Sequence, residues 1–182
     1  MKPAAFDFES YLIAPGRLAP RPVCLTHHVE DERPDILTPG DGLDWLEDQL
    51  RDPESILVGA NTAYDIGVAL EARPQLLELV VDAYEADRVV DVQIIEQLNL
   101  ISRGWLKFDP RTGRPPDLSL AGLTAKYTGV KLEGKDGADA WRFRYHELDG
   151  MPLDRWPEAA TEYALTDSIA TLKVFERQGG IK

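Results

Sequence analysis

The segment ILVGANTAYD, residues 56–65, passes from a strand pattern directly into a helix pattern. Residues 56–59 are an apolar run bounded by Asn61, which is typical of a buried strand. Residues 63–73 then have the character of a helix, and Pro74 stops it. The helix therefore begins at the carboxyl end of a strand, which is where sites gather in open α/β sheets.

Strand and helix patterns recur along the rest of the chain. Before residue 56 we expect a helix that Asp41 caps and Pro53 ends, preceded by strands at residues 4–9, 22–30 and around 36–37. After residue 74 we expect a strand at residues 88–92 and helices at residues 75–86, 93–101, 118–127 and 157–176. Strands that first form a meander and then alternate with helices predict an α/β domain with a mixed sheet.

Two stretches lack a regular pattern. Residues 102–117 contain three prolines and two glycines and are expected to form an irregular connection. Residues 128–151 are polar and rich in glycine, and aromatic residues alternate there with arginines: Trp141, Arg142, Phe143, Arg144 and Tyr145. This stretch is either an ordered loop or a flap that grips a substrate. The sequence leaves open whether Trp141 and Tyr145 stack on bases or fill a core.

Length and composition describe an ordinary globular chain. Its 182 residues suffice for one domain with a substantial core, so we expect a single domain over residues 1–182. No apolar run approaches the roughly 20 residues that a membrane span needs, and the N-terminus lacks the pattern of a secretory signal. Cys24 is the only cysteine, so no internal disulfide can form. These features predict a cytoplasmic protein that does not associate with membranes.

The charge of the chain is unevenly distributed. A net charge of −12 argues against a passive nucleic-acid binder, which would usually be basic. Residues 102–145, however, hold nine basic residues against five acidic ones: Arg103, Lys107, Arg111, Arg114, Lys126, Lys131, Lys135, Arg142 and Arg144. A basic segment beside an acidic remainder suits a protein that holds cations at one place and phosphates at another. The alternative is a solvated loop with scattered charge.

Two carboxylates share one face of the first expected strand. Successive side chains of a strand point to opposite faces, so Asp7 and Glu9 point the same way, with backbones roughly 6.5–7 Å apart. Phe6 and Phe8 occupy and bury the other face. Two carboxylates at this spacing can share one divalent cation, which offsets their repulsion. The alternative is an edge strand whose polar face is only hydrated.

Asp65 lies in the first turn of its helix, directly after Tyr64, and Asn61 stands just before that helix. An asparagine cap followed by an acidic residue in the first turn is ordinary helix stabilisation, and this is the alternative to a role in a site. The position of the helix at the carboxyl end of a buried strand favours the site.

The last expected helix carries a carboxylate among small and apolar residues. Its stripe comprises Ala160, Tyr163, Asp167, Ala170 and Val174, while Leu165, Ile169 and Leu172 occupy the opposite side. A helix that is apolar on both faces is buried, so Asp167 needs a cation or a hydrogen-bond donor. The alternative is that Tyr163, one turn away, donates to Asp167 within the core.

Other chemistries find little support in the sequence. His27 and His28 are neighbours on a strand and face opposite ways, and His146 stands alone, so a zinc site is not expected. No serine, histidine and aspartate pattern suggests nucleophilic catalysis.

Taken in order, these segments resemble the three motifs of the DEDD superfamily of 3′–5′ exonucleases. Asp7-Phe8-Glu9 matches the first motif, Asn61 through Tyr64-Asp65 the second, and Tyr163 through Asp167 the third. The third form marks the tyrosine subgroup, which includes the proofreading domain of bacterial DNA polymerase I and ribonuclease D-like enzymes. The histidine subgroup would have histidine where this chain has Glu162. Residues 119–123 and Tyr127 also resemble the helix that precedes the last motif in those proofreading domains.

The resemblance implies a ribonuclease H-like fold, with a five-stranded mixed sheet flanked by helices. It implies a two-metal mechanism with two divalent cations, Mg²⁺ or Mn²⁺, the ions that suit an all-carboxylate site. Asp7, Glu9 and Asp167 would hold one ion, and Asp7 aided by Asp65 the second. Tyr163 would orient the attacking water. The expected contacts to the terminal nucleotide are Asn61, Ile13 and Tyr64.

Three hypotheses about function follow. The first is a 3′–5′ exonuclease that releases nucleoside monophosphates from the 3′ end of single-stranded DNA. The second is a ribonuclease D-like exoribonuclease, because neither the carboxylates nor Tyr163 read the sugar; we favour DNA over RNA. The third is a non-catalytic domain that keeps the fold for a partner. The resemblance leaves open whether the chain acts alone or in association with a polymerase region or subunit.

Overall fold

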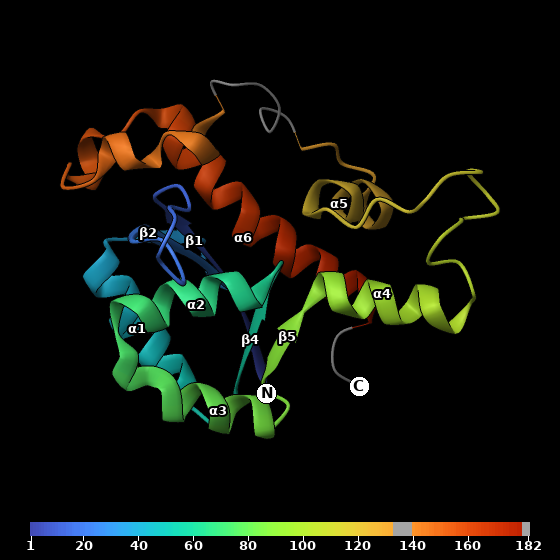
Figure 1. Cartoon of the computed structure of the whole chain (residues 1–182), viewed down its shortest axis with the longest axis horizontal. Helices are drawn as coiled ribbons and strands as arrows, with labels where there is room; N and C mark the ends of the chain where they lie inside the picture. The colour runs from blue at the N-terminus through green and yellow to red at the C-terminus, as the bar shows by residue number, and fades with distance from the viewer. Residues whose placement is uncertain (133–139, 180–182) are drawn as a thin grey trace.

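A five-stranded mixed sheet forms the centre of the computed structural model, which describes residues 1–132 and 140–179 (Figure 1). Lys135 of the basic segment therefore lies outside the described residues. The strand order is β3-β2-β1-β4-β5. The strands are β1 (Lys2–Ser10), β2 (Pro22–Val29), β3 (Asp35–Leu37), β4 (Ser55–Gly59) and β5 (Val89–Asp91). The expected α/β fold with five strands in a mixed sheet is confirmed.

The strand that carries Asp7 and Glu9 is the central strand of the sheet. It pairs antiparallel with β2 as far as Ser10, and parallel with β4 only from Lys2 to Ala5. The reading of this segment as an edge strand is therefore wrong. Beyond Ala5, β1 runs past the end of β4, and there its backbone is open to groups from other elements. This overhang is where the acidic residues lie.

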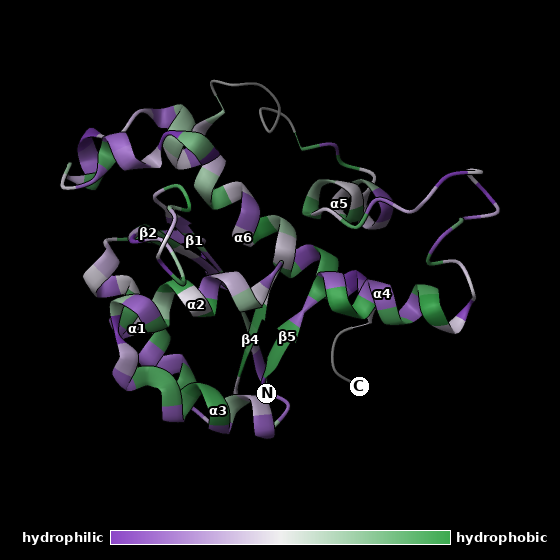
Figure 2. Ribbon diagram, in the orientation of Figure 1, coloured by the Kyte–Doolittle hydropathy of each residue, from purple (hydrophilic) through white to green (hydrophobic). Residues whose placement is uncertain are grey.

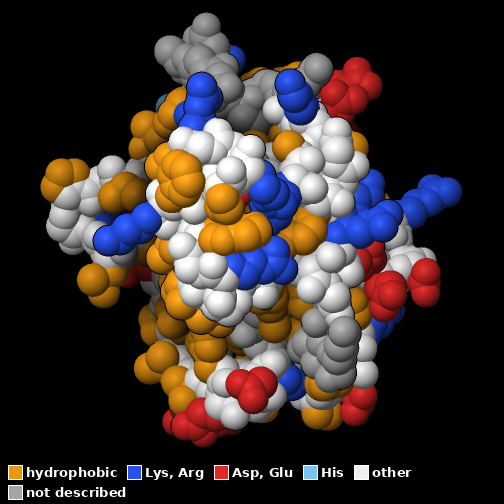
Figure 3. Space-filling view, turned by 90° about the vertical axis from the view of Figure 1, so that its right-hand side faces the viewer, with side chains coloured by type: hydrophobic (Ala, Val, Ile, Leu, Met, Phe, Trp, Pro, Cys, Tyr) orange, Lys and Arg blue, Asp and Glu red, His pale blue; other side chains and the backbone are white. Residues whose placement is uncertain are grey.

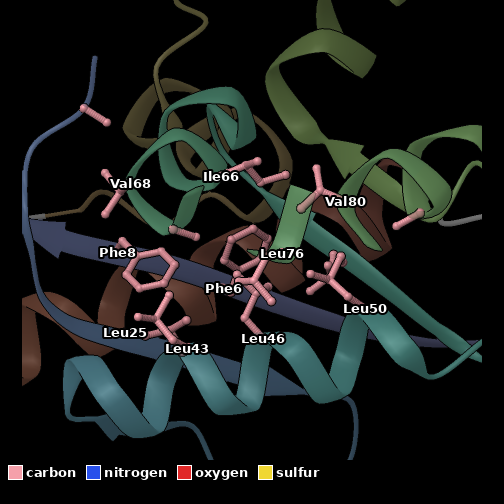
Figure 4. Packing of buried hydrophobic residues seen from close by; sticks show 14 residues of the cluster. Phe6, Phe8, Leu25, Leu43, Leu46, Leu50, Ile66, Val68, Leu76 and Val80 are labelled. Carbon is pink, nitrogen blue, oxygen red and sulfur yellow. The ribbon is translucent and has the colours of Figure 1, made fainter. Parts of the chain in front are cut away.

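One face of the sheet is covered by the helices of the first half of the chain. These are α1 (Pro39–Arg51), α2 (Thr62–Ala72), the short 3₁₀ helix η1 (Pro74–Leu76) and α3 (Leu77–Glu85). Figure 4 shows their side chains packing on Phe6 and Phe8, as expected for that face of β1. Full burial of a phenylalanine side chain contributes about 1.5–3 kcal/mol, so these two residues hold the β1 register firmly.

The opposite face is covered by α4 (Val92–Ser102), α5 (Leu120–Thr128) and α6 (Glu158–Gln178). Ala5 of β1, the neighbour of Phe6, packs there with Leu123 of α5 and Leu172 of α6. Since side chains alternate along a strand, Asp7 and Glu9 share this face with Ala5. Figure 2 shows the apolar residues of β4 and β5 in green between the two layers.

Local details differ from the sequence-based expectation at two helices. Thr38 rather than Asp41 caps α1: its Oγ1 accepts a hydrogen bond from the Asp41 backbone N–H at 3.3 Å. The helix then begins with Pro39, whose fixed φ suits the first helical position. The single helix expected at residues 75–86 is divided into η1 and α3.

The prediction that α6 is buried on both faces is confirmed for its C-terminal half, where Ala170 and Val174 on one side and Leu172 on the other are all buried. In its N-terminal half the helix is buried along one stripe. The buried stripe includes the small residues Ala160, Ala164 and Ser168, whereas Leu165 and Ile169 are half-buried. Small side chains let the helix approach β1 and β2 closely, and the Thr26 hydroxyl donates to the Ala164 carbonyl at 3.2 Å. Tyr163 and Asp167 border this stripe and are held over the end of β1.

The described part of residues 128–151 contains two short 3₁₀ helices, η2 (Trp141–Phe143) and η3 (Tyr145–Leu148), and η4 (Leu153–Arg155) follows. Tyr145 is fully buried, and its hydroxyl donates to the Ala160 carbonyl at 2.8 Å. Trp141 packs against the same cluster of buried residues. These two aromatic residues therefore contribute to a core, which answers the question left open by the sequence. No helix in residues 1–132 and 140–179 is long and apolar enough to cross a membrane.

Candidate active site

Three carboxylates from β1 and α6 meet over the central strand. Asp7, Glu9 and Asp167 each offer an oxygen atom, and these atoms lie within 4.8 Å of one another. Glu9 is 8% exposed, and the other two are half-buried. The strand period places the first two side chains on one face, and the small residues of α6 bring the third close to them. The structure thus joins residues that are far apart in the sequence.

Asp65 occupies a different position, beside the three but against the backbone of β1. Its Oδ1 accepts a hydrogen bond from the Phe8 backbone N–H at 3.0 Å. This N–H lies on the overhang of β1, past the last residue that pairs with β4. Asp65 is 2% exposed, and burial, followed by the negative charge of Asp7, raises its pKa well above the ordinary value. Asp65 therefore lies close to Asp7, Glu9 and Asp167, but one of its carboxylate oxygens already accepts a hydrogen bond from the backbone.

Asn61 does not cap α2 through its side chain, contrary to the alternative reading of the second motif. It is exposed and has left-handed backbone angles, φ +72° and ψ +47°, which asparagine tolerates better than most residues. The helix is capped instead by Asp91 at the end of β5: Asp91 Oδ2 accepts from the Thr62 backbone N–H at 2.8 Å. Asn61 is thereby left available to face the cleft described next.

All eight residues expected to form the site line one cleft of about 930 Å³. Besides the four carboxylates and Tyr163, the cleft is lined by the three expected nucleotide contacts Asn61, Tyr64 and Ile13. The Tyr64 hydroxyl and Ser10 Oγ are hydrogen-bonded at 2.7 Å, which fixes the tyrosine beside the last residue of β1. Ile13 follows β1 and is 73% exposed. The cleft therefore combines an acidic centre with exposed apolar surface.

Tyr163 stands beside the acidic centre as a protonated phenol. Its pKa is raised above that of an ordinary tyrosine, first by burial and then by the charges of Asp167 and Glu9. The positive charge of Arg142 acts in the opposite direction. The phenol consequently keeps its proton at neutral pH, where it can donate or orient but cannot act as a strong base.

The sequence did not predict a role in the site for several residues that the structure places in or near it. Arg142 and Phe143 of η2 line the cleft, as do Ser119, Leu120 and Ala121 at the start of α5. The signal for Arg142 and Phe143 was the alternation of aromatic and basic residues around residue 143. Residues 119–123 were noted only for their resemblance to the helix that precedes the last motif. Asp91 gave no signal, although it caps α2 and, through Oδ1, also accepts from Gln93 N–H of α4 at 2.8 Å.

A basic and apolar surface lies on the side of the molecule that α4, α5 and their connection form. Figure 3 shows Lys and Arg side chains between hydrophobic ones on this face. Within the connection, the guanidinium groups of Arg103 and Arg111 lie 5.7 and 5.2 Å from the centre of the Trp105 ring. Lys107 and Arg114 are exposed beside them. The basic segment expected from the sequence is thus solvent-facing at these positions.

The acidic group fits a divalent cation by its donor chemistry. Carboxylate oxygens are the ligands that Mg²⁺ and Mn²⁺ prefer, and the three oxygens lie close enough to contact one ion. Gathering this much negative charge is unfavourable unless a cation offsets it; after burial, the charge of Asp7 is what raises the pKa of Asp65 most.

A five-stranded mixed sheet with acidic residues over its central strand is the arrangement of ribonuclease H-like exonuclease domains. The family model described as 3′-5′ exonuclease matches residues 2–177, so the chain belongs to this exonuclease family. The enzyme class expected from the three motifs, a 3′–5′ exonuclease, is confirmed. A comparison with curated proteins finds no match.

Solved structures support the fold. The Nibbler EXO domain of Aedes aegypti superposes with a TM-score of 0.64 at 14% identity, over 96% of this chain and 76% of that domain. RNase D of Escherichia coli superposes with a TM-score of 0.60 at 21% identity, over 97% of this chain and 39% of that protein. The chain thus spans well under half of RNase D.

Proposed function

We propose that this domain removes nucleotides one at a time from the 3′ end of single-stranded nucleic acid by metal-dependent hydrolysis. The observation that carries the proposal is the group formed by Asp7, Glu9 and Asp167, with oxygens within 4.8 Å of one another in a cleft of about 930 Å³. A cleft of this size accommodates a terminal nucleotide with its phosphate.

Each acidic residue has a separate part in this proposal. Asp7, Glu9 and Asp167 would hold one divalent cation, and Asp7 with Asp65 would hold a second. The bound ions would supply an activated water and offset the charge that develops on the phosphate. The hydrogen bond from Phe8 N–H fixes the Asp65 carboxylate, so its second oxygen is oriented in advance.

The neighbouring polar and apolar residues hold the substrate. Tyr163, protonated and half-buried, orients the water that attacks. Asn61, Tyr64 and Ile13 contact the terminal nucleotide from one side of the cleft. The exposed cations between α4 and α5 contact phosphates further along the strand, because their charge complements a polyanion in a chain of net charge −12.

DNA is the substrate we propose first, and RNA is the second candidate. RNase D of Escherichia coli is an exoribonuclease involved in structured RNA processing, and this fold neighbour is the observation that favours RNA. The residues of the acidic group contact phosphate and water, which both polymers offer. The 2′-hydroxyl is the feature by which a protein distinguishes RNA from DNA.

The test compares DNA and RNA oligonucleotides of one sequence, each labelled at the 5′ end. In manganese, the wild-type protein should shorten the label-bearing product in single-nucleotide steps, and the substrate that is shortened faster defines the preference. Asp7→Ala should lose this activity with an unchanged circular dichroism spectrum. Asp82→Ala, which removes an exposed carboxylate on α3, is the matched control. Equal activity in wild type and Asp7→Ala would end the proposal.

A further inference from the structure

We propose that Arg142 and Phe143 form a nucleotide-binding pair, in which the guanidinium holds a phosphate and the phenyl ring holds a base within the last two nucleotides of the substrate strand. This inference rests on the proposed function and deepens it. It assigns a role to η2, which lies outside the three sequence motifs.

Charge is the first observation that supports the pair. Among the described residues that line the cleft, Arg142 is the only basic one. The same cleft contains four carboxylates, Asp7, Glu9, Asp65 and Asp167. A phosphodiester strand that enters such a cleft is repelled wherever no cation faces it. A guanidinium presents five N–H donors in a planar fork that matches phosphate oxygens.

The place of Arg142 is the second observation. It is exposed on η2 and lines the same cleft as Tyr163, and its charge acts on that phenol. Its neighbour Arg144 is not among the described residues that line the cleft: it forms a two-pronged ion pair with Glu147 at 2.8 and 2.9 Å and lies over the Trp141 ring. The adjacent arginines are therefore positioned for different tasks.

Phe143 supplies the third observation. Tyr145 is buried, whereas Phe143 is 38% exposed and lines the cleft. A large apolar side chain left in contact with water inside a cleft suits contact with a base, because stacking on aromatic rings tolerates any base. The Arg142 guanidinium lies 4.5 Å from the centre of the Phe143 ring, which holds the two side chains together before the substrate binds.

The experiment measures binding without cleavage. A fluorescein-labelled oligothymidylate of about 12 nucleotides, within the usual site sizes for single strands, is titrated in EDTA and followed by fluorescence anisotropy. Arg142→Gln should weaken binding by about tenfold at low salt, in line with loss of a charge-assisted contact. It should also lower the slope of log K against log salt by about 0.7, because one phosphate contact is lost.

Phe143→Ala should weaken binding by a similar factor, about tenfold, but leave the salt slope unchanged. An abasic site in either of the last two nucleotides should weaken binding to wild type and remove the difference between wild type and Phe143→Ala. Abasic sites near the middle of the strand should leave that difference intact. The measurement with abasic oligonucleotides on wild type alone tests the base contact even if Phe143→Ala does not fold.

Matched controls separate the pair from general surface effects. Arg155→Gln removes an exposed arginine of η4, and Tyr84→Ala removes a ring on α3 that is 44% exposed and lies outside the cleft. Both should bind as wild type does near the 3′ end. Arg142→Lys should restore most of the salt slope and part of the affinity. If Arg142→Gln and Arg155→Gln weaken binding equally, or if terminal abasic sites leave the effect of Phe143→Ala unchanged, the inference is overturned.

The outcome also distinguishes the inference from the proposed function. Wild type that binds through the pair but degrades no oligonucleotide in manganese would end the proposed function and keep the pair. Wild type that degrades the oligonucleotide while both variants bind normally would end the inference and keep the function. Wild type that neither binds the oligonucleotide in EDTA nor degrades it in manganese would overturn both.

Discussion

Asp167→Asn should stabilise the metal-free protein and remove most of its response to manganese. The oxygens of Asp167, Asp7 and Glu9 lie within 4.8 Å of one another. At that separation two unit charges repel by about 3.5 kcal/mol if the effective dielectric constant is about 20. Replacing one carboxylate by an amide of the same size removes two of the three repulsive pairs.

The stabilisation stays below the resulting sum of about 7 kcal/mol. Protonating one ordinary aspartate at neutral pH costs about 4 kcal/mol, and a cluster under greater repulsion would take up a proton first. Asp7 and Asp167 are also half-exposed, so water screens their repulsion further. We therefore expect the free energy of unfolding to rise by about 1–2 kcal/mol in the presence of a chelator.

Urea unfolding of wild type, Asp167→Asn and Asp82→Asn, in EDTA and in manganese, provides the assay. The carboxylate of Asp82 is exposed on α3, so its removal changes the net charge equally without touching the cleft. Manganese at about 100 times its dissociation constant should stabilise wild type by about 2.7 kcal/mol and the Asp167 variant by much less. The reasoning fails if Asp167→Asn is less stable than wild type in EDTA, or if it gains as much from manganese.

The remaining predictions concern single side chains. Because the pKa of Asp65 is raised in the folded protein, its contribution to stability is complete below about pH 4 and is lost as the pH rises through the folded-state pKa. The melting temperature in EDTA should therefore fall towards neutral pH. In Asp65→Asn it should fall less steeply. Tyr163→Phe should keep the melting temperature within a few degrees and lower the turnover number by about tenfold or more, measured with a 3′-labelled oligonucleotide under saturation. Glu96→Gln should lower the free energy of unfolding in urea by about 1–3 kcal/mol. The reason is that the buried Glu96 carboxylate pairs with Lys126 and accepts a hydrogen bond from the Tyr127 hydroxyl at 2.5 Å. A loss below about 0.5 kcal/mol, the size expected of a surface substitution, would contradict this prediction.

The parts of the fold that could be predicted are those that local sequence determines. Phe6 and Phe8 alternate with acidic residues, and this alone fixes which face of β1 is buried. The change from an apolar run to a helix at residues 56–65 locates α2 at the end of β4. The buried stripe of α6 could not be predicted in the same way, because hydrophobicity gives weight to Leu165 and Ile169. Close helix-to-sheet packing selects small residues such as Ala164 instead.

The parts of the site that could not be predicted depend on contacts between distant segments. Asp91 follows Thr62 by 29 residues, and nothing near either residue shows that one carboxylate caps both α2 and α4. The sequence around Asn61 therefore suggests a capping role that its left-handed backbone and exposed side chain do not support. The exposure of Phe143 beside a buried Tyr145 likewise depends on how η2 and η3 pack against α6.

Under the proposed function, the composition of the cleft predicts that metal and nucleic acid bind cooperatively. Four carboxylates face a polyanionic strand, and within the described lining only Arg142 opposes them. Without a cation, a strand gains contacts to Arg142 and to apolar surface but meets repulsion from the acidic group. A divalent ion reverses the local charge and so raises the affinity for the strand. Because such coupling is reciprocal, the strand must raise the affinity for the ion by the same factor. An acidic protein can thus bind nucleic acid selectively in its metal-loaded form, for which the net charge of the chain is no obstacle.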